Sequence, residues 1–148
     1  LSLFITVTFL SSFLVIILHP DIFFQFVRVI LTLVVREISE LAYADYIENV
    51  FPNDEYLGEI VLEKLVYYPT VPREPYKNNG RLTELMTSGK LFLDLNQPYP
   101  NVNDDRFMIC GSPSMIKDLV AILKSKDFTE ARNIKLGNYV IERAFVEP

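Results

Sequence analysis

The chain has 148 residues, of which 50% are hydrophobic and 22% charged, values typical of one folded domain rather than of a disordered segment. The net charge of −5 argues against nucleic acid as the main partner, because phosphate backbones bind to basic surfaces. A single cysteine, Cys110, and a single histidine, His19, exclude an internal disulfide framework and most structural zinc sites.

The first 35 residues are strongly apolar and allow two interpretations. Residues 1–20 contain no Asp, Glu, Lys or Arg, and a stretch of that length is sufficient to cross a membrane. However, residues 3–8 are β-branched and aromatic, which favours a buried parallel strand, and the His19-Pro20-Asp21 segment breaks the run. We therefore expect a central strand at 2–7, a turn and a short buried helix. The alternative is a small membrane-anchored protein with residues 1–35 in the bilayer.

The remaining sequence alternates between strand-like and helix-like segments. Continuous apolar runs predict further strands at 28–35, 65–71, 107–110 and 139–145. Helices are expected from Ser39, from Leu82 to a stop at Gly89, and after a cap at Ser112. Their predicted core positions are Ile38, Leu41, Ala42, Tyr46 and Val50 in the first helix, Leu82, Leu85 and Met86 in the second, and Ile116, Leu119, Val120 and Leu123 in the third. This order predicts an α/β fold, a doubly wound five-stranded parallel sheet, as one domain over residues 1–148.

In such sheets, ligands bind beyond the carboxyl ends of the strands, where the turn at Cys110-Gly111-Ser112 is expected. Glycine permits the backbone to approach a ligand, and the start of the following helix offers N–H groups. The alternative is a buried structural thiol beside a helix cap. The turn at residues 6–12 takes the usual place of a glycine-rich phosphate loop, but it contains no glycine and by itself is no nucleotide fingerprint.

Three arginines also follow strand ends: Arg36, Arg73 and Arg81. Because the carboxyl ends of parallel strands share one edge, these guanidinium groups are candidates to converge on a phosphate, which they bind as a bidentate fork. The alternative is that all three are solvated surface charges, two of them paired with Glu37 and Glu74.

Several motifs spread along the chain point to one family. They are SELAYADYI at 39–47, LVYYPT at 65–70, REP at 73–75, GRLT at 80–83, SGKLF at 88–92, DDR at 104–106, MICGSPSM at 108–115 and YVIERAFVE at 139–147. Together they resemble the bacterial ferredoxin (flavodoxin)–NADP reductases, but only the C-terminal, NADP-binding half of that family. The resemblance implies a cytoplasmic, N-terminally truncated protein that lacks the upstream FAD-binding barrel and is inactive without it.

The resemblance also implies roles for individual residues. In the intact family, a hydride passes between NADPH and FAD, and single electrons pass between FAD and ferredoxin or flavodoxin. Cys110 and Glu142 are the expected catalytic residues, with Cys110 near the hydride-bearing carbon of the nicotinamide. The expected cofactor-binding residues are Thr6 and Thr8 at the pyrophosphate, Arg36, Arg73 and Arg81 at the adenosine 2′-phosphate, Gly111 and Ser112 at the nicotinamide ribose, and Ala144 and Phe145, which with Glu142 face the flavin. No metal, nucleic acid or membrane partner is implied.

The sequence departs from the family pattern near its beginning. Val7 and Phe9 stand where a TGTGLAP-like loop has two glycines, Ser11 and Ser12 replace its alanine and proline, and Leu33-Val34 replace a His-Gly pair. A side chain at a former glycine blocks close approach of the backbone to a diphosphate and disfavours positive φ by ~1–2 kcal/mol. We therefore expect these substitutions to weaken NADP binding.

Overall fold

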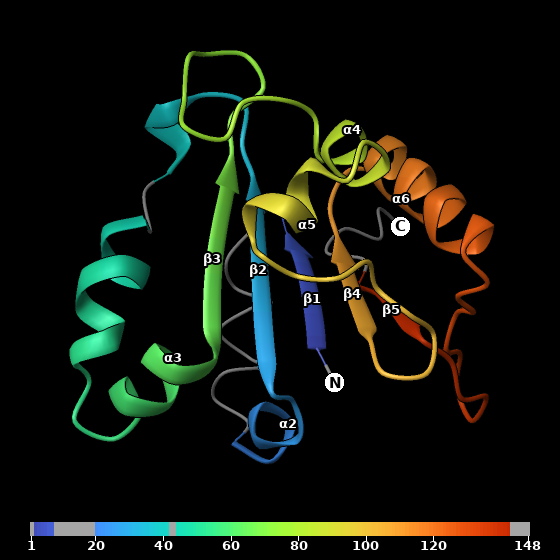
Figure 1. The fold of residues 1–148 in the computed structure, drawn as a ribbon, viewed down its shortest axis with the longest axis horizontal. Helices are drawn as coiled ribbons and strands as arrows, with labels where there is room; N and C mark the ends of the chain where they lie inside the picture. The colour runs from blue at the N-terminus through green and yellow to red at the C-terminus, as the bar shows by residue number, and fades with distance from the viewer. Residues whose placement is uncertain (1, 8–19, 42–43, 143–148) are drawn as a thin grey trace, which may run out of the picture.

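The computed structural model describes residues 2–7, 20–41 and 44–142. Five parallel strands form one sheet in the order β3-β2-β1-β4-β5 (Figure 1). The strands are β1 (Ser2–Val7), β2 (Arg28–Val34), β3 (Leu65–Thr70), β4 (Arg106–Cys110) and β5 (Tyr139–Glu142). The predicted doubly wound parallel sheet is confirmed, and β1 is its central strand as expected.

The inner strands form because their sequences are apolar on both faces. Ile5 of β1 pairs with Leu31 of β2, and neither side chain is exposed to solvent. On the opposite face of β1, the ring of Phe4 stacks on that of Phe107 with centroids 4.8 Å apart. Continuous hydrophobic runs of this kind are typical of parallel strands that are covered on both sides.

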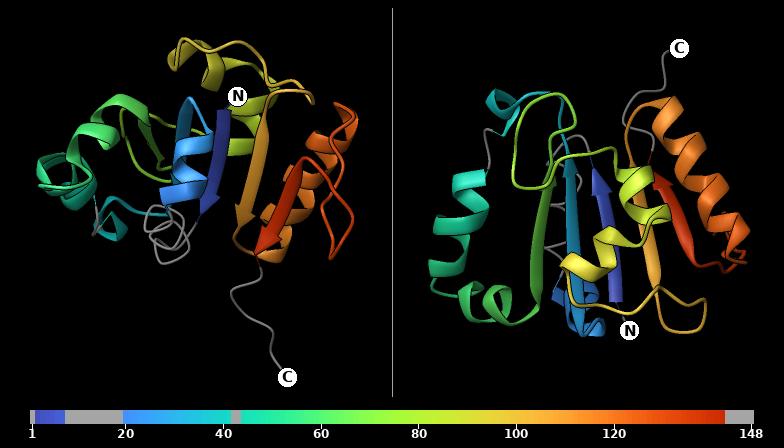
Figure 2. Two further views of the ribbon diagram at one scale, coloured as in Figure 1. Left: turned by 90° about the horizontal axis from the view of Figure 1, so that it is seen from below. Right: turned by 45° about the horizontal axis from the view of Figure 1, so that its top comes forward.

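One face of the sheet is covered by α4 (Leu82–Thr87), α5 (Lys90–Asp94) and α6 (Pro113–Ser125) (Figures 1 and 2). The residues of this layer that pack on the sheet include Leu82, Leu85, Met86, Leu91, Phe92, Leu119 and Leu123. The predicted stop at Gly89 is confirmed, because this glycine has φ +79° and separates α4 from α5. The predicted buried face of α6 is also observed.

The other face packs against α2 (Pro20–Gln25), the helical turns η2 (Tyr46–Val50) and η3 (Phe51–Asn53), and α3 (Gly58–Lys64). The apolar residues of this second layer include Phe23, Phe26, Ile47, Phe51 and Val61, which join Leu3, Ile5, Val29 and Leu31 of the sheet. Because helical segments lie on both faces, the sheet is doubly wound as the sequence predicts.

The predicted helix from Ser39 is wrong in its boundaries and its buried face. A 3₁₀ turn, η1, covers Ile38–Glu40 after Glu37 rather than Ser39, and the wide π turn of η2 follows further along. Ile38, Tyr46 and Val50, expected in the core, are exposed, whereas Ile47 is buried. The predicted core positions follow from a regular helix of 3.6 residues per turn. The tighter 3₁₀ turn of η1 and the wider π turn of η2 depart from that period, so that other side chains face the core. Ala42 lies outside the described residues.

Three short helices, α2, α3 and α5, were not predicted from the sequence. The sequence predicts a break at His19-Pro20-Asp21, but Pro20 is the first residue of α2 and Asp21 lies in its first turn. Proline is well suited to that position, because the first helical N–H has no intrahelical partner.

Within the described parts of the chain, no helix has the length and apolar character needed to span a membrane. Residues 2–7 and 28–34 are instead inner strands of the sheet, which disfavours the membrane-anchored alternative. The predicted helix after Ser12 lies outside the described residues.

Candidate functional site

The strand order places a topological switch between β1 and β4. From β1 the chain proceeds outward to β2 and β3, and it then returns to the other side of β1 to form β4 and β5. Thr6 pairs with Ile109 across this junction, so that Cys110 is the next residue at the carboxyl end of β4. Ligands of open α/β sheets bind in the crevice beyond such a junction.

The turn after β4 has the local structure that the sequence predicts. Ser112 caps α6, and its Oγ accepts a hydrogen bond from the Met115 N–H at 3.4 Å, while Pro113 is the first helical residue. Cys110 is fully buried, and Glu142 of β5, its register partner, is exposed. Cys110, Gly111 and Ser112 therefore lie at the switch point, and Glu142 lies one strand away.

Thr6 and its neighbours lie differently from a phosphate-binding loop. The Thr6 side chain is buried, and its Oγ1 is 2.9 Å from Oγ1 of Thr32, so that its hydroxyl meets a neighbouring strand rather than solvent. Strand β1 continues through Val7. The remaining residues expected at the pyrophosphate or the flavin lie outside the described part of the chain; they are Thr8, Phe9, Ser11, Ser12, Ala144 and Phe145.

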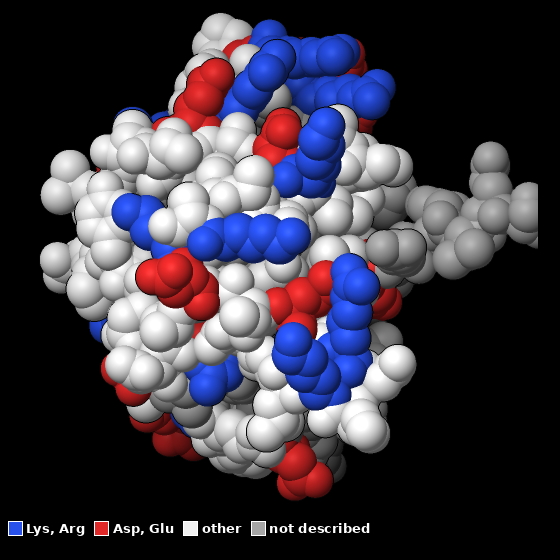
Figure 3. Space-filling view, turned by 90° about the vertical axis from the view of Figure 1, so that its right-hand side faces the viewer, with Lys and Arg blue, Asp and Glu red and all other residues white. Residues whose placement is uncertain are grey.

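Arg36, Arg73 and Arg81 all lie at the carboxyl edge of the sheet and are exposed. Arg36 follows β2, Arg73 follows β3, and Arg81 is the N-cap residue of α4. Figure 3 shows Lys and Arg side chains gathered at the top of the molecule, the end at which Figure 1 places the loop after β3. Among the described residues, none of the three arginines forms an ion pair with a carboxylate.

Glu37 and Glu74, the two carboxylates expected as pairing partners, and the nearby Glu40 have other contacts. Glu74 Oε2 accepts the backbone N–H of Ile38 at 2.6 Å, and Glu40 Oε2 accepts the backbone N–H of Arg36 at 2.8 Å. Glu37 accepts a weak hydrogen bond from the Ser39 hydroxyl at 3.5 Å. Glu40 and Glu74 therefore hold backbone groups of the loops, Glu37 contacts a side-chain hydroxyl, and none of the three pairs with a guanidinium group within the described residues.

The arginines and the thiol lie at different positions along one edge. Three strand spacings separate β3 from β4, a distance of about 14 Å at roughly 4.8 Å for each pair of strands. The site is therefore extended, with a basic part beyond β2 and β3 and a part beyond β1 and β4 at Gly111, Ser112 and the start of α6, where Cys110 itself is buried in the core. This arrangement suits a long ligand that carries negative charge at one end.

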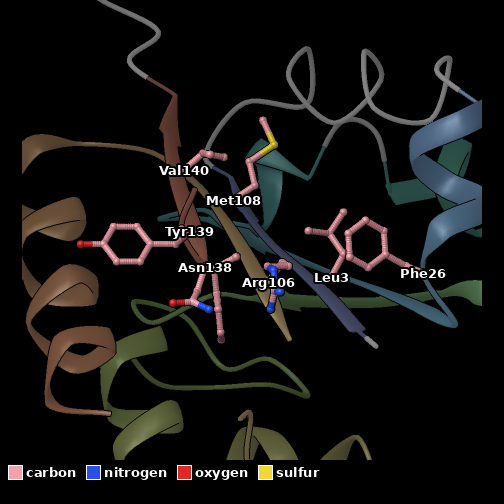
Figure 4. A pocket seen from close by; sticks show the side chains of 9 residues that line it. Leu3, Phe26, Arg106, Met108, Asn138, Tyr139 and Val140 are labelled. Carbon is pink, nitrogen blue, oxygen red and sulfur yellow. The ribbon is translucent and has the colours of Figure 1, made fainter. Parts of the chain in front are cut away.

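A hollow of about 300 Å³ opens at the opposite edge of the sheet (Figure 4). Its walls come from the beginnings of β1, β4 and β5 and from Phe26, and Leu3, Met108 and Val140 make it apolar. The lining also includes Arg106, but its Nη1 already donates to the backbone oxygens of Val102 and Asp105, at 3.1 and 2.8 Å. We therefore place the candidate site at the carboxyl edge.

Several bacterial reductases match nearly the whole chain. No protein-family model matches the sequence. Over 143 residues, or 96% of its length, the chain is 51% identical to the ferredoxin–NADP reductase of Pseudomonas aeruginosa and 48% identical to that of Azotobacter vinelandii. It is 35% identical over 141 residues to the flavodoxin/ferredoxin–NADP reductase of Rhodobacter capsulatus. The chain is similar to one half of a ferredoxin–NADP reductase.

The matched part is the C-terminal one, and the chain spans about half the length of these reductases, 55% for the first two. The resemblance inferred from the sequence motifs is thereby confirmed. A ferredoxin NADP+ reductase from Neisseria gonorrhoeae with bound FAD and NADP superimposes with a TM-score of 0.80 at 23% identity, over 97% of this chain and 56% of that one. At this identity the superposition shows that the two share a fold.

Two residues of the site escaped sequence-based reasoning. The sequence suggests Glu74 only as a partner for the neighbouring Arg73, whereas its hydrogen bond reaches a backbone group 36 positions away. The sequence indicates no role for Thr32, although its hydroxyl contacts that of Thr6 under the switch point. Neither contact has a local signal in the sequence, because each depends on the alignment of parallel strands.

Proposed function

We propose that this chain binds NADP(H) as the nicotinamide-nucleotide half of a ferredoxin–NADP reductase. In this proposal, Arg36, Arg73 and Arg81 hold the adenosine 2′-phosphate, and the Cys110–Ser112 turn borders the nicotinamide. The observation that carries it is the presence of three exposed arginines at the carboxyl edge that form no ion pair within the described residues. Guanidinium groups in that state are available for the bidentate contacts that phosphate favours.

The residues present fit the adenosine side of the nucleotide better than its pyrophosphate. The loop expected to cradle the pyrophosphate has no glycine, and the Thr6 hydroxyl is already paired with Thr32. Binding energy should therefore be concentrated at the arginines, where each charge-assisted hydrogen bond contributes about 1.5–3 kcal/mol.

The flavin side of the reaction is proposed to come from outside these 148 residues. NADP(H) and FAD supply the hydride chemistry when both are bound, whereas the protein binds and orients them. Glu142, exposed at the end of β5 and in register with Cys110, is the described residue that we propose faces the flavin. Ferredoxin or flavodoxin is the proposed electron partner of the whole enzyme.

The proposed phosphate site is tested by titrating the chain with 2′-phospho-AMP and with AMP, which differ by the phosphate alone. The wild type should bind 2′-phospho-AMP more tightly, and the ratio of the two affinities should fall as salt is added, because exposed charges are screened. Arg81→Ala should lower this ratio by about tenfold, the loss of roughly one charge-assisted contact. Arg28→Ala removes an exposed arginine at the amino end of β2 and should leave the ratio unchanged. Equal affinities in the wild type refute the proposal.

A further inference from the structure

One carboxylate joins the two loops that carry Arg36 and Arg73. Glu74 follows Arg73 in the loop after β3, and its Oε2 accepts the N–H of Ile38 in the loop after β2 at 2.6 Å. Ile38 is the first residue of the 3₁₀ turn η1, and Glu37 before it makes no capping hydrogen bond. The side chain that satisfies this turn therefore comes from a different loop, 36 positions away.

Apart from the ion pair of Lys77 Nζ with Glu48 Oε1 of η2 at 3.6 Å, the other polar contacts among the described residues hold each loop to its own part of the chain. In the loop after β3, Asn78 Nδ2 donates to the Pro69 carbonyl oxygen and Asn79 Nδ2 donates to the carbonyl oxygen of Glu74, both at 2.9 Å. In the loop after β2, Glu40 accepts the Arg36 N–H at 2.8 Å. Beyond the last backbone bond between the strands, from Val35 N–H to the Thr70 oxygen, the Glu74–Ile38 contact is the hydrogen bond that joins the two loops among the described residues.

We propose that Glu74 is a positioning residue, which sets Arg36 and Arg73 at the separation that binding of one phosphate requires. This inference rests on the proposed function, because it assumes that both arginines contact the 2′-phosphate. A phosphate held by two guanidinium groups requires both forks to point at the same phosphate group, so that a relative shift of the loops weakens the contacts. Glu74 holds the backbone next to Arg73 against the backbone two residues beyond Arg36.

For the removal of Glu74, the proposal and simple electrostatics predict opposite changes in the affinity for 2′-phospho-AMP. A carboxylate beside a phosphate site repels the ligand, and removing its charge should therefore strengthen binding of 2′-phospho-AMP. If Glu74 positions the loops, its removal should weaken binding even though a repulsive charge is lost. Glutamine separates the two effects, because it removes the charge and keeps an oxygen that accepts the Ile38 N–H.

The experiment measures the affinity ratio of 2′-phospho-AMP to AMP for the wild type, Glu74→Ala, Glu74→Gln and Glu37→Ala. Glu74→Ala should lower the ratio by about tenfold, comparable to the loss of one charge-assisted contact, and leave the AMP affinity unchanged. Glu74→Gln should keep the wild-type ratio or exceed it. Glu37→Ala removes a carboxylate next to Arg36 that makes no bond to the other loop, and its ratio should equal or exceed that of the wild type.

The outcomes distinguish this inference from the proposed function. If the wild type shows no preference for 2′-phospho-AMP, the phosphate site itself is refuted. If the wild type shows the preference and Arg81→Ala lowers it, but Glu74→Ala matches or exceeds the wild type, only the positioning role is refuted. Thermal unfolding of each variant should change little, because the Glu74–Ile38 bond is exposed and water can replace it. A Glu74→Ala variant with a wild-type unfolding temperature and a reduced ratio supports the inference.

Discussion

The two edges of the sheet use their arginines in different ways. At the amino edge, buried Asp105 accepts the N–H of Ser2 at 3.1 Å and that of Asn101 at 2.9 Å. Arg106 donates from Nη1 to the backbone oxygens of Val102 and Asp105, at 3.1 and 2.8 Å. Asp105 and Arg106 therefore satisfy the protein's own backbone.

At the carboxyl edge, the carboxylates hold backbone groups but the arginines do not. Glu40 and Glu74 each accept a backbone N–H, whereas Arg36, Arg73 and Arg81 form no ion pair within the described residues. Arg106 is half-buried and its Nη1 donates to backbone oxygens, whereas the three arginines of the carboxyl edge are exposed. A cation whose donors are already used by carbonyl groups supports the fold, and a cation whose donors are available can bind an anion.

Removing Asp105 should have the largest effect on folding. Asp105→Ala leaves the N–H groups of Ser2 and Asn101 without their acceptor, and we expect the free energy of unfolding to fall by about 2–3 kcal/mol. Unfolding in urea at pH 7 measures this change. Asp104→Ala is the matched control, since Asp104 is exposed and accepts only from the side chain of Asn101, at 3.1 Å. It should change stability by less than about 0.5 kcal/mol.

The same variant also tests whether the edges are independent. Asp105→Ala should retain the wild-type preference for 2′-phospho-AMP over AMP when it is measured well below the unfolding temperature. A lost preference in folded Asp105→Ala, or equal destabilisation by the two aspartate variants, contradicts the division between a structural edge and a binding edge.

Removing Arg73 should weaken ligand binding and leave the stability of the fold unchanged. Arg73→Ala should lower the affinity ratio of 2′-phospho-AMP to AMP by about tenfold, because one bidentate contact is lost. Its unfolding free energy should stay within about 0.5 kcal/mol of the wild type, as is usual for an exposed side chain. Calorimetric titration and urea unfolding give the two values. Loss of stability without loss of the ratio would show that Arg73 supports the fold, as Arg106 does.

The strands and the best-formed helix ends could be predicted because their signals are local. Ile5, Val29 and Leu31 lie in uninterrupted apolar runs, and all three are completely buried in the sheet. Ser112 followed by proline predicts a helix start, and Gly89 predicts a helix stop. In each case a few adjacent residues determine the backbone conformation, so that no information from distant parts of the chain is needed.

The segment between β2 and β3 and the contacts of the site could not be predicted in the same way. The π turn at η2 buries Ile47 in place of Tyr46 and Val50, and its width is not encoded in a simple hydrophobic period. The Glu74–Ile38 and Thr6–Thr32 contacts join residues that become neighbours only when the strands pair. The sequence thus predicted where the arginines lie, but not what holds their loops together.

The smallest change in unfolding free energy is expected from a polar contact between α5 and β3. Asp94 of α5 accepts hydrogen bonds at Oδ2 from Lys90 Nζ at 2.6 Å and from the Tyr68 hydroxyl at 2.7 Å. The bond from Lys90 and then that from Tyr68 lower the pKa of Asp94 below its ordinary value. A carboxylate whose pKa is lower in the folded state stabilises the protein above its unfolded pKa of about 3.9, and this contribution is lost as pH falls through the folded pKa.

The difference in unfolding free energy between the wild type and Asp94→Asn should therefore be constant between about pH 5 and 8 and should narrow below about pH 4. At neutral pH, this difference should be smaller than the effect of Asp105→Ala on stability and of Arg73→Ala on the affinity ratio, because a solvent-exposed ion pair contributes little. Urea unfolding across this pH range provides the measurement. Asp118→Asn changes an exposed aspartate on α6 and should alter stability little at any of these pH values. A difference for Asp94→Asn that widens as pH falls contradicts the prediction, because it would mean that protonation strengthens the contact with Lys90 and Tyr68.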